Sequence, residues 1–313
     1  MGAVYINIVF IFVLMFLGYY LTYKGWFNDT VGDAFSKLVL QIALPSSMFL
    51  TITRNFTQAE FLELAKGTIV PLVSMLLTFV VSFIYIKVFK LAVSRRGIFS
   101  TAFTCSNTIF IGLPINYAIF GSRAIPFALL YYIVNTTLFW TVGIYLIASD
   151  NPQFTKEKVQ FNPLVALKKI FSPALGGFML GVTWVLIQLP LPESVTTFLA
   201  YLANLTTPLS MFIIGIIVYG VGITKLSLDK EIIGVLVGRY LISPLLVWAV
   251  GQFITVPPLM LSVFIIQAAM PMQNSIPILA RSYQADQKFA ASSLGYSVLL
   301  YLLYIPVLLK IML

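Results

Sequence analysis

The sequence predicts an all-α polytopic membrane protein with ten transmembrane helices, and three observations support this prediction. The 313-residue chain is 60% hydrophobic and 9% charged, whereas a soluble domain carries about 25% charged residues. Its apolar runs are around 20 residues long, the length that an α-helix needs to cross a bilayer. Transmembrane barrels are excluded because their strands are short and alternating. The runs predict spans at 3–23, 31–53, 67–89, 97–120, 125–148, 166–189, 195–219, 232–254, 259–285 and 288–311.

Composition also excludes several kinds of site and partner. The chain has no His, so histidine metal sites and His-based catalysis are ruled out, and we expect no metal and no cofactor. Its one cysteine, Cys105, has no partner for an intrachain disulfide. The net charge of +9 does not indicate a nucleic-acid partner, because the basic residues lie in short loops between spans. The N-terminus lacks a charged leader and a cleavage site, so we interpret it as the first span.

The chain divides into two halves that resemble each other. A polar connection at 149–165 separates a first repeat, 1–148, from a second, 166–313. Pro45 in LPSSMF and Pro208 in TPLSMF are 163 residues apart, and so are Pro114 in LPI and Pro277 in IPI. A duplicated half of five spans must begin on opposite sides of the membrane, so the repeat is inverted. Inverted repeats are the usual build of secondary transporters, which bind substrate at midplane between broken helices.

Charge in the connections predicts the orientation. Most Lys and Arg residues fall in the odd-numbered connections, which are therefore expected in the cytoplasm. Both termini are then extracytoplasmic, in the cell membrane.

Two spans carry Gly, Pro and polar residues at mid-depth, where a broken helix must be buried in protein or line a wet cavity. The fourth span contains NTIFIGLPI and the ninth contains PMQNSIP, and the neighbouring fifth span adds a polar pair at 135–136. Free N–H groups at a half-helix end suit an anion, and amide side chains add neutral hydrogen bonds. Packing kinks are the alternative interpretation. The predicted substrate-binding residues are Asn107, Thr108, Gly112, Pro114, Asn135, Pro271, Gln273, Asn274, Ser275 and Pro277.

A few charged residues lie near or inside spans. Arg239 falls inside the eighth span, where backbone carbonyls or a substrate anion are its candidate partners. Arg281 follows the ninth-span break and either snorkels or attracts an anion. Asp33 and Lys37 are four residues apart and form a candidate coupling pair. No acid lies deep in a span, so protons could instead travel on a weak-acid substrate.

The broken segments resemble those of a known family. Asn107–Ile115, the Met270–Pro271 pair and the run ILARSYQAD are similar to the auxin efflux carrier family, in its compact bacterial branch of malate and malonate permeases. The resemblance covers essentially the whole chain. It implies an NhaA-like crossed-helix fold, a scaffold of spans 1, 2, 6 and 7 kinked at Pro45 and Pro208, and a moving domain of spans 3–5 and 8–10.

These features suggest three hypotheses for the function. The first is a secondary transporter of a small organic anion such as malate, moving by an elevator-like slide, with a homodimer as a candidate assembly. The second is a sodium- or proton-coupled transporter of another substrate on the same fold: an auxin-like weak acid, a bile-acid-like anion or a cation. The third is a sensor or intramembrane enzyme, which the lack of an appended soluble domain and of a catalytic set disfavours. We expect that the protein is not an enzyme.

Overall fold

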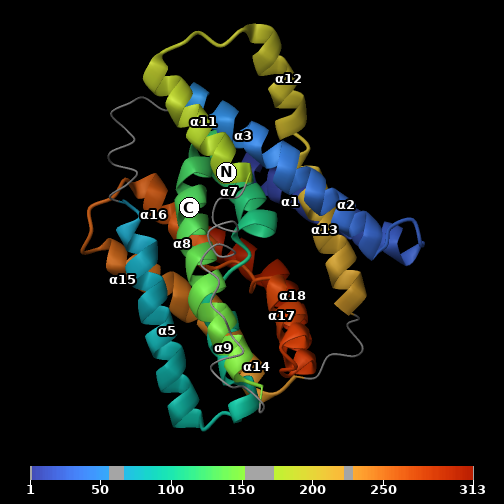
Figure 1. Ribbon diagram of the computed structural model, residues 1–313, viewed down its shortest axis with the longest axis vertical. Coiled ribbons are helices and arrows are strands. Elements are labelled where there is room, and N and C mark those ends of the chain that lie inside the picture. The colour runs from blue at the N-terminus through green and yellow to red at the C-terminus, as the bar shows by residue number, and fades with distance from the viewer. Residues whose placement is uncertain (1, 56–66, 152–172, 222–227, 313) are drawn as a thin grey trace. The chain divides into compact units, whose positions relative to one another are not determined.

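The computed structural model describes residues 2–55, 67–151, 173–221 and 228–312, and their regular elements are helices (Figure 1). Six helical stretches among these residues are long and apolar enough to cross a membrane, and four apolar helices are shorter. The all-helical, multi-pass prediction is confirmed, while the count of ten spans and the inverted repeat stay predictions. Of the connection predicted at 149–165, residues 152–165 lie outside the described part. The six long stretches are Asp29–Arg54, Ile69–Phe89, Ser122–Ser149, Glu193–Gly220, Lys230–Gly251 and Gln287–Ile311.

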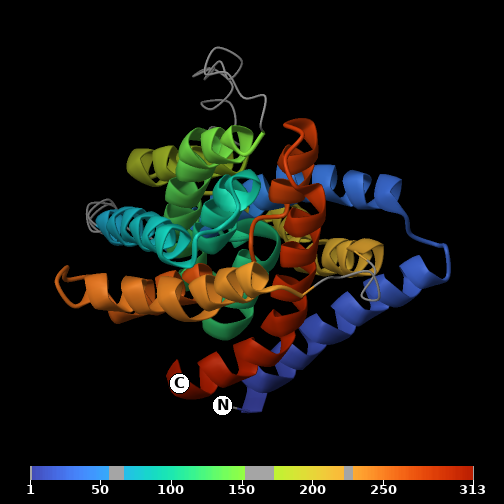
Figure 2. The same cartoon turned by 90° about the horizontal axis from the view of Figure 1, so that it is seen from below.

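The chain packs into two compact units. Unit 1 comprises Met1–Lys66, Ile109–Leu130 and Lys168–Gly220. In Figure 2, α1 runs from the N-terminus to a turn where the chain reverses into α2. The helices of unit 1 are α1 (Gly2–Tyr23), α2 (Asp29–Leu38), α3 (Leu44–Asn55), α7 (Leu113–Phe120), α11 (Pro173–Ile187), α12 (Glu193–Ala203) and α13 (Thr206–Val221), with α8 (Ile125–Leu138) beginning in it.

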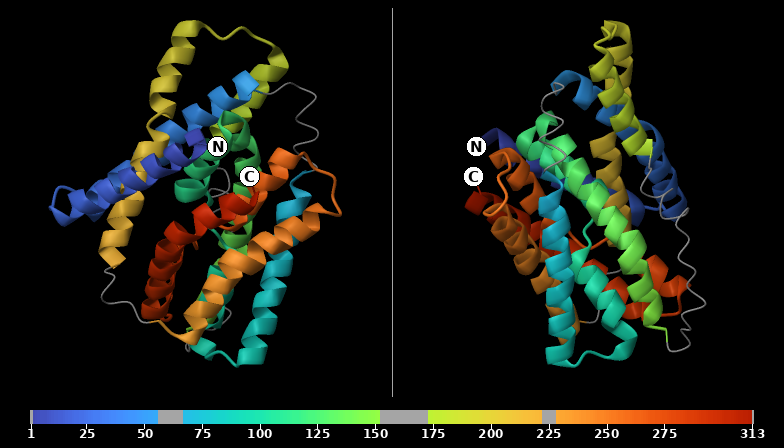
Figure 3. Two further views of the ribbon diagram at one scale, coloured as in Figure 1. Left: turned by 180° about the vertical axis from the view of Figure 1, so that it is seen from behind. Right: turned by 60° about the vertical axis from the view of Figure 1, so that its left-hand side comes forward.

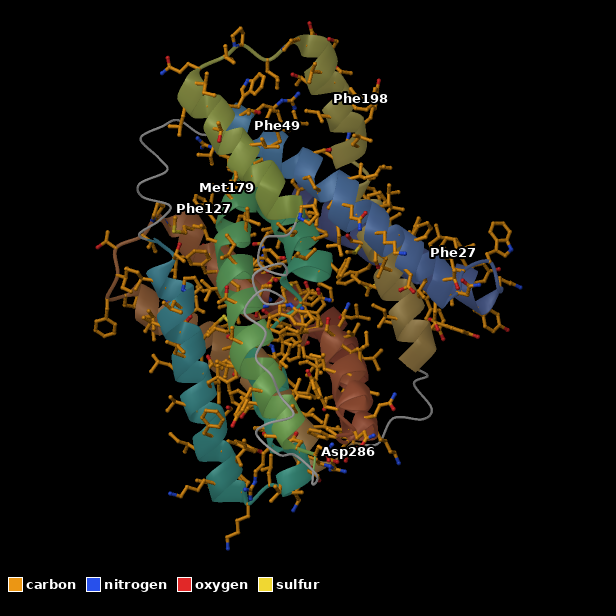
Figure 4. The ribbon with its side chains drawn as sticks, in the orientation of Figure 1. Phe27, Phe49, Phe127, Met179, Phe198 and Asp286 are labelled. Atoms are coloured by element: carbon orange, nitrogen blue, oxygen red, sulfur yellow. The ribbon has the colours of Figure 1, made fainter. Side chains whose placement is uncertain are left out.

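Small residues bring the helices of unit 1 into close contact. A Cβ on Gly18 of α1 would lie 2.8 Å from the Phe212 backbone of α13, and one on Gly215 would lie 2.3 Å from the Met15 carbonyl oxygen. The backbones of α1 and α13 therefore touch, as small residues permit between membrane helices. Helix α11 packs along α3, and Phe49 lies where they meet (Figure 4), with its ring edge-to-face on Trp184.

Unit 2 comprises Gly67–Thr108, Tyr131–Leu167 and Val221–Leu313. Its helix α15 lies beside α5 (Figure 3), and the Ser82 and Ser100 hydroxyls, 2.8 Å apart, join α5 to α6. The helices of unit 2 are α5 (Ile69–Phe89), α6 (Arg96–Thr104), α9 (Ile144–Ser149), α14 (Lys230–Val237), α15 (Ser243–Gly251), α16 (Pro258–Ala268), α17 (Ser275–Ser282) and α18 (Gln287–Met312).

Wide π turns interrupt several of the spans. Each π turn keeps the chain helical but changes the direction in which the side chains after it point around the helix axis. Such turns are frequent at functional sites. The turn at Gly238–Ile242 joins α14 to α15 and carries Arg239. The others are Val39–Ala43, Thr108–Gly112 and Phe139–Gly143.

Candidate functional site

Two extended segments cross at the centre of unit 2. Helix α6 ends at Thr104 and α16 ends at Ala268, and after each the chain leaves the helical conformation. The segments pair antiparallel at Ser106 and Met272. The Asn107 N–H donates to the Pro271 carbonyl (2.8 Å), and the Gln273 N–H donates to the Cys105 carbonyl (3.1 Å). The predicted breaks in the fourth and ninth segments are therefore confirmed, and they satisfy part of each other's backbone.

Side chains from neighbouring helices complete this pairing. The amide of Asn135 on α8 accepts from the Ser106 N–H (2.9 Å) and donates to the Ser106 carbonyl (3.0 Å), as a third strand would. The Gln267 amide donates to the Thr108 carbonyl at 3.3 Å. Asn135 is fully buried. Its role in this structure is to hold the first segment, which is how a buried amide keeps irregular backbone satisfied inside a membrane.

Two amide side chains link the segments directly. The Asn107 amide donates to the side-chain oxygen of Asn274 at 2.8 Å. Asn107 is buried, whereas Gln273, Asn274 and Ser275 are partly exposed. The structure thus brings together five of the predicted substrate-binding residues: Asn107, Pro271, Gln273, Asn274 and Ser275.

Helix ends of both signs meet this crossing. Helix α17 begins at Ser275, and the π turn before α7 begins at Thr108. The first N–H groups of a helix lack partners within it and carry partial positive charge. The carbonyl ends of α6 and α16, by contrast, lie at the other side of each break. The crossing therefore combines two N-terminal helix ends with amide groups.

Arg239 binds the two carbonyl ends. Its guanidinium is fully buried. Nη1 donates to the carbonyls of Phe103 (3.2 Å) and Thr104, Nε to that of Met270 (3.2 Å), and Nη2 to that of Ala268. Of the two partners that the sequence left open for this arginine, the structure shows backbone carbonyls.

The prolines lie differently from the prediction. Pro114 is the second residue of α7, and Pro277 the third of α17. Gly112 is the last residue of a π turn. A proline has no N–H and is tolerated in the first turn of a helix, where that N–H would have no partner. Pro277 therefore marks where a helix resumes after its break, whereas Pro114 lies inside the helical stretch Thr108–Phe120, directly after its π turn.

Other predicted residues lie away from the crossing. Pro45 directly follows the π turn inside the helical stretch Asp29–Arg54, and Pro208 stands in the first turn of α13; both lie in unit 1. Asp33 and Lys37 are both exposed and form none of the ion pairs found among the described residues. The side chain of Arg281, in α17, lies outside the described part. The candidate coupling pair is therefore not formed in this structure.

Unit 1 holds a cavity of its own. Its volume is about 590 Å³, and it is lined by α1, α3, α7 and the turn between α12 and α13. The lining includes Pro114 and Tyr117 of α7, and Arg54 is the one charged residue among the described residues that line the cavity. Cavities of 300–1,000 Å³ suit small ligands. The sequence did not predict this cavity, because its residues come from four distant parts of the chain.

An ion cluster lies at one end of unit 2. Arg95 bonds Asp229 (3.0 Å), Glu231 (2.6 Å) and Asp286 (2.7 Å), the last labelled near the bottom of Figure 4. Burial lowers the pKa of Arg95, but its bonds to Glu231 and Asp286 outweigh burial and raise it. The cluster ties the start of α6 to the starts of α14 and α18.

Asp150, just after α9, is a buried acid that the sequence did not single out. Its carboxylate accepts from the N–H groups of Gly97 (2.7 Å) and Ile98 (2.8 Å), at the start of α6. Burial raises the pKa of Asp150 to about 7, although these two N–H groups and the charge of Arg96 lower it. The only sequence signal was its place beside a span end, which is common to most acids of this chain.

Comparison with known proteins agrees with this architecture. A family model described as "Membrane transport protein" matches residues 3–309. The chain is 25% identical over 298 residues to the uncharacterized transporter MJ1031 of Methanocaldococcus jannaschii, covering 92% of both chains. It is also 25% identical over 304 residues to the uncharacterized transporter YfdV of Escherichia coli strain K12, covering 95% of this chain and 93% of that protein.

Proposed function

We propose that this chain, which belongs to the membrane transport protein family of auxin efflux carriers, carries a small organic anion across the membrane. Membership makes it a multi-pass membrane transporter and not an enzyme. The anionic substrate is the proposal. One observation carries it: the crossing in unit 2 combines two N-terminal helix ends with the amides of Asn107 and Asn274.

The charge balance of the crossing favours an anion. N-terminal helix ends carry about half a positive charge each. The opposing carbonyl ends are already hydrogen-bonded to Arg239. A carboxylate placed beside Asn107 and Ser275 would meet the Asn107 amide and the N-terminal end of α17. The ion-paired acids of the described residues lie elsewhere, around Arg95.

Malate is the first substrate that we propose, on the resemblance to malate and malonate permeases alone. A dicarboxylate offers acceptors for the amides of Asn107, Gln273 and Asn274. The cavity of unit 1, with Arg54 as its charged lining residue, supports a negatively charged ligand independently. The proposed substrate is therefore a small acid with an apolar or hydroxylated body.

We propose an elevator-like mechanism from the same resemblance. Spans 3–5 and 8–10, which include the crossing, are the proposed moving part, and spans 1, 2, 6 and 7, with Pro45 and Pro208, are the proposed scaffold. Unit 1 also contains Ile109–Leu130 from the predicted moving spans. Location in the cell membrane with both termini outside, and assembly as a homodimer, belong to the same proposal.

Coupling is proposed to occur through the substrate. A proton carried on a weak acid needs no carboxylate in the protein, whereas proton or sodium coupling through the protein usually uses one inside the membrane. The buried Asp150 lies after α9 and caps α6, so it is occupied structurally. The alternative, a sodium- or proton-coupled carrier of another substrate, predicts a different ion dependence.

The test is uptake of labelled malate into proteoliposomes with and without an inward proton gradient. We expect saturable uptake that unlabelled malonate inhibits and that an organic cation does not. Saturable uptake of a cation, without inhibition by any organic acid, would contradict the proposal. If malate is not transported, auxin-like and other weak acids are tested next, and failure of every acid tested would likewise reject an anion carrier.

A further inference from the structure

Arg239 is a fully buried cation. No carboxylate of the described residues lies within 4 Å of its guanidinium, and the ion pairs found there all involve Arg95. A charge buried in this way must be compensated by dipoles or by pairing. Its compensation comes from the four main-chain carbonyls at the crossing.

These carbonyls belong to the ends of two helices. Phe103 and Thr104 are the last residues of α6, while Ala268 ends α16 and Met270 follows it. Each helix end carries about half a negative charge, so two ends together balance about one positive charge. The single guanidinium charge of Arg239 therefore matches the two dipoles that it binds.

A π turn and a neighbouring glycine bring Arg239 close to α6. Arg239 lies in the π turn between α14 and α15, next to Gly238. A Cβ on Gly238 would lie 2.2 Å from the Phe103 ring, so only glycine lets the turn approach α6 this closely. The Ser243 hydroxyl adds a bond to the Phe103 carbonyl at 3.4 Å.

A cage of main-chain carbonyls is also a binding site for an alkali cation, because rings of such oxygens replace the hydration shell of the ion. We propose that Arg239 is a tethered cation: its guanidinium fills the carbonyl cage between α6 and α16, so that anion binding at the crossing requires no Na⁺ or K⁺. The statement that anion binding needs no Na⁺ or K⁺ rests on the proposed anion transport. The statement that Arg239 fills the carbonyl cage does not. Arg239 is thus a positioning residue, which holds the two breaks without touching the substrate.

The first experiment uses the unmodified protein. Thermal stability in detergent and uptake of labelled malate are measured in NaCl, KCl and choline chloride of equal concentration. We expect both quantities to be the same in the three salts. A severalfold stimulation of uptake by Na⁺ or K⁺ over choline, or a rise in melting temperature with either ion alone, would overturn the inference.

The second experiment empties the cage. Arg239→Ala is expected to lose uptake by about tenfold or more in choline chloride. Millimolar methylguanidinium, or Na⁺ or K⁺, should restore part of the uptake and raise the melting temperature by about 3 °C or more, since binding to the folded state stabilises it. Arg95→Ala is the matched control, because its partners are side-chain carboxylates, and it should show no such rescue.

The two readouts separate this inference from the transport proposal. The melting temperature needs no substrate, so rescue of stability without any malate uptake would keep the tethered cation and reject malate transport. A folded Arg239→Ala protein that responds to neither methylguanidinium nor alkali cations would reject the tethered cation. If Arg239→Ala does not fold, Arg239→Lys takes its place, since a lysine keeps the charge but lacks the planar fork. Arg239→Lys should then fold and stay independent of Na⁺ and K⁺, and a requirement for either ion would contradict the inference.

Discussion

Two arginines of unit 2 meet opposite kinds of partner. Arg239, at the crossing, is fully buried and binds four main-chain carbonyls. Arg95, at one end of the unit, has a side chain that is 30% exposed and binds three carboxylates. The first neutralises the dipoles of interrupted helices, whereas the second neutralises side-chain charges near water. The comparison teaches that a cation inside a membrane protein need not be matched by an acid.

The largest expected difference is between Arg239→Met and Arg95→Met. Removing Arg239 leaves buried carbonyls without donors, so we expect a loss of about 3–5 kcal/mol in the free energy of unfolding. Removing Arg95 separates partly exposed charges, which should cost roughly 1 kcal/mol. Thermal melting of both variants in the same detergent measures the difference. An equal or larger loss in Arg95→Met would contradict the comparison.

A smaller effect is expected where an amide replaces a backbone partner. Asn135→Ala leaves the buried N–H of Ser106 unsatisfied, at a cost of roughly 1–3 kcal/mol. The Ser106 carbonyl loses one of its two donors and keeps the Thr108 N–H. Asn116→Ala is the control. Among the described residues, the Asn116 amide donates to the Gly112 carbonyl one turn earlier in its own helical stretch and holds no extended segment. Melting temperatures should fall clearly further for Asn135→Ala. Similar values for the two would mean that the first extended segment does not depend on its amide support.

At the end of unit 2 that also holds Arg95, Asp150→Asn should change how stability depends on pH. The folded protein, in which the pKa of Asp150 is about 7, keeps a proton that the unfolded chain has released above its ordinary pKa near 3.8. The unfolded state therefore binds fewer protons in this window, and stability should fall as pH rises from about 4 to 7 and then level off. Arg96 and Asp286 are the charged groups that act on it. Melting curves from pH 5 to pH 8 should flatten in Asp150→Asn, and an unchanged slope would contradict this assignment.

The smallest expected effect is a difference in how the destabilisation by Arg95→Met and by Arg239→Met depends on salt concentration. Salt weakens the attraction between exposed charges, with a Debye length of about 8–10 Å near physiological ionic strength. It weakens buried hydrogen bonds much less. The destabilisation by Arg95→Met should therefore shrink as choline chloride is raised, while that by Arg239→Met should not. Choline is used because it cannot enter a carbonyl cage. Equal salt dependence of the two variants would indicate that Arg95 and Arg239 share one type of environment.

The sequence predicted the class of fold and the two broken segments, because apolar length and mid-span polar residues are local signals. It placed the breaks around Pro114 and between Pro271 and Pro277. Pro271 does lie in the second break, but Pro277 stands in the first turn of α17, and Pro114 follows the π turn of a helix that has already resumed at Thr108. Proline marks the restart of a helix as readily as its end. Of the extended residues before them, Asn107 and Gln273 are predicted site residues because of their polar side chains, whereas Cys105 and Ser106 are not.

The partners of Arg239 could not be identified from the sequence, because backbone carbonyls are present at every position. Which carbonyls are free depends on where α6 and α16 end. The π turn at Gly238–Ile242 and the cavity of unit 1 are invisible in the sequence for a similar reason. Each depends on how distant helices pack, and apolar sequences show little of this. Asn135 is predicted as a polar residue inside a span, but only the structure shows that it supports Ser106.

The central claim is that the crossing of unit 2 binds the transported anion, and one measurement tests it most directly. Uptake of labelled malate into proteoliposomes is compared for the wild type, Asn107→Ala and the control Asn116→Ala, at equal amounts of folded protein. We predict a loss of about tenfold or more in Asn107→Ala, because the amide between the two segments is removed, and near-normal uptake in Asn116→Ala. Full uptake in Asn107→Ala would contradict the claim and assign the crossing a purely structural role.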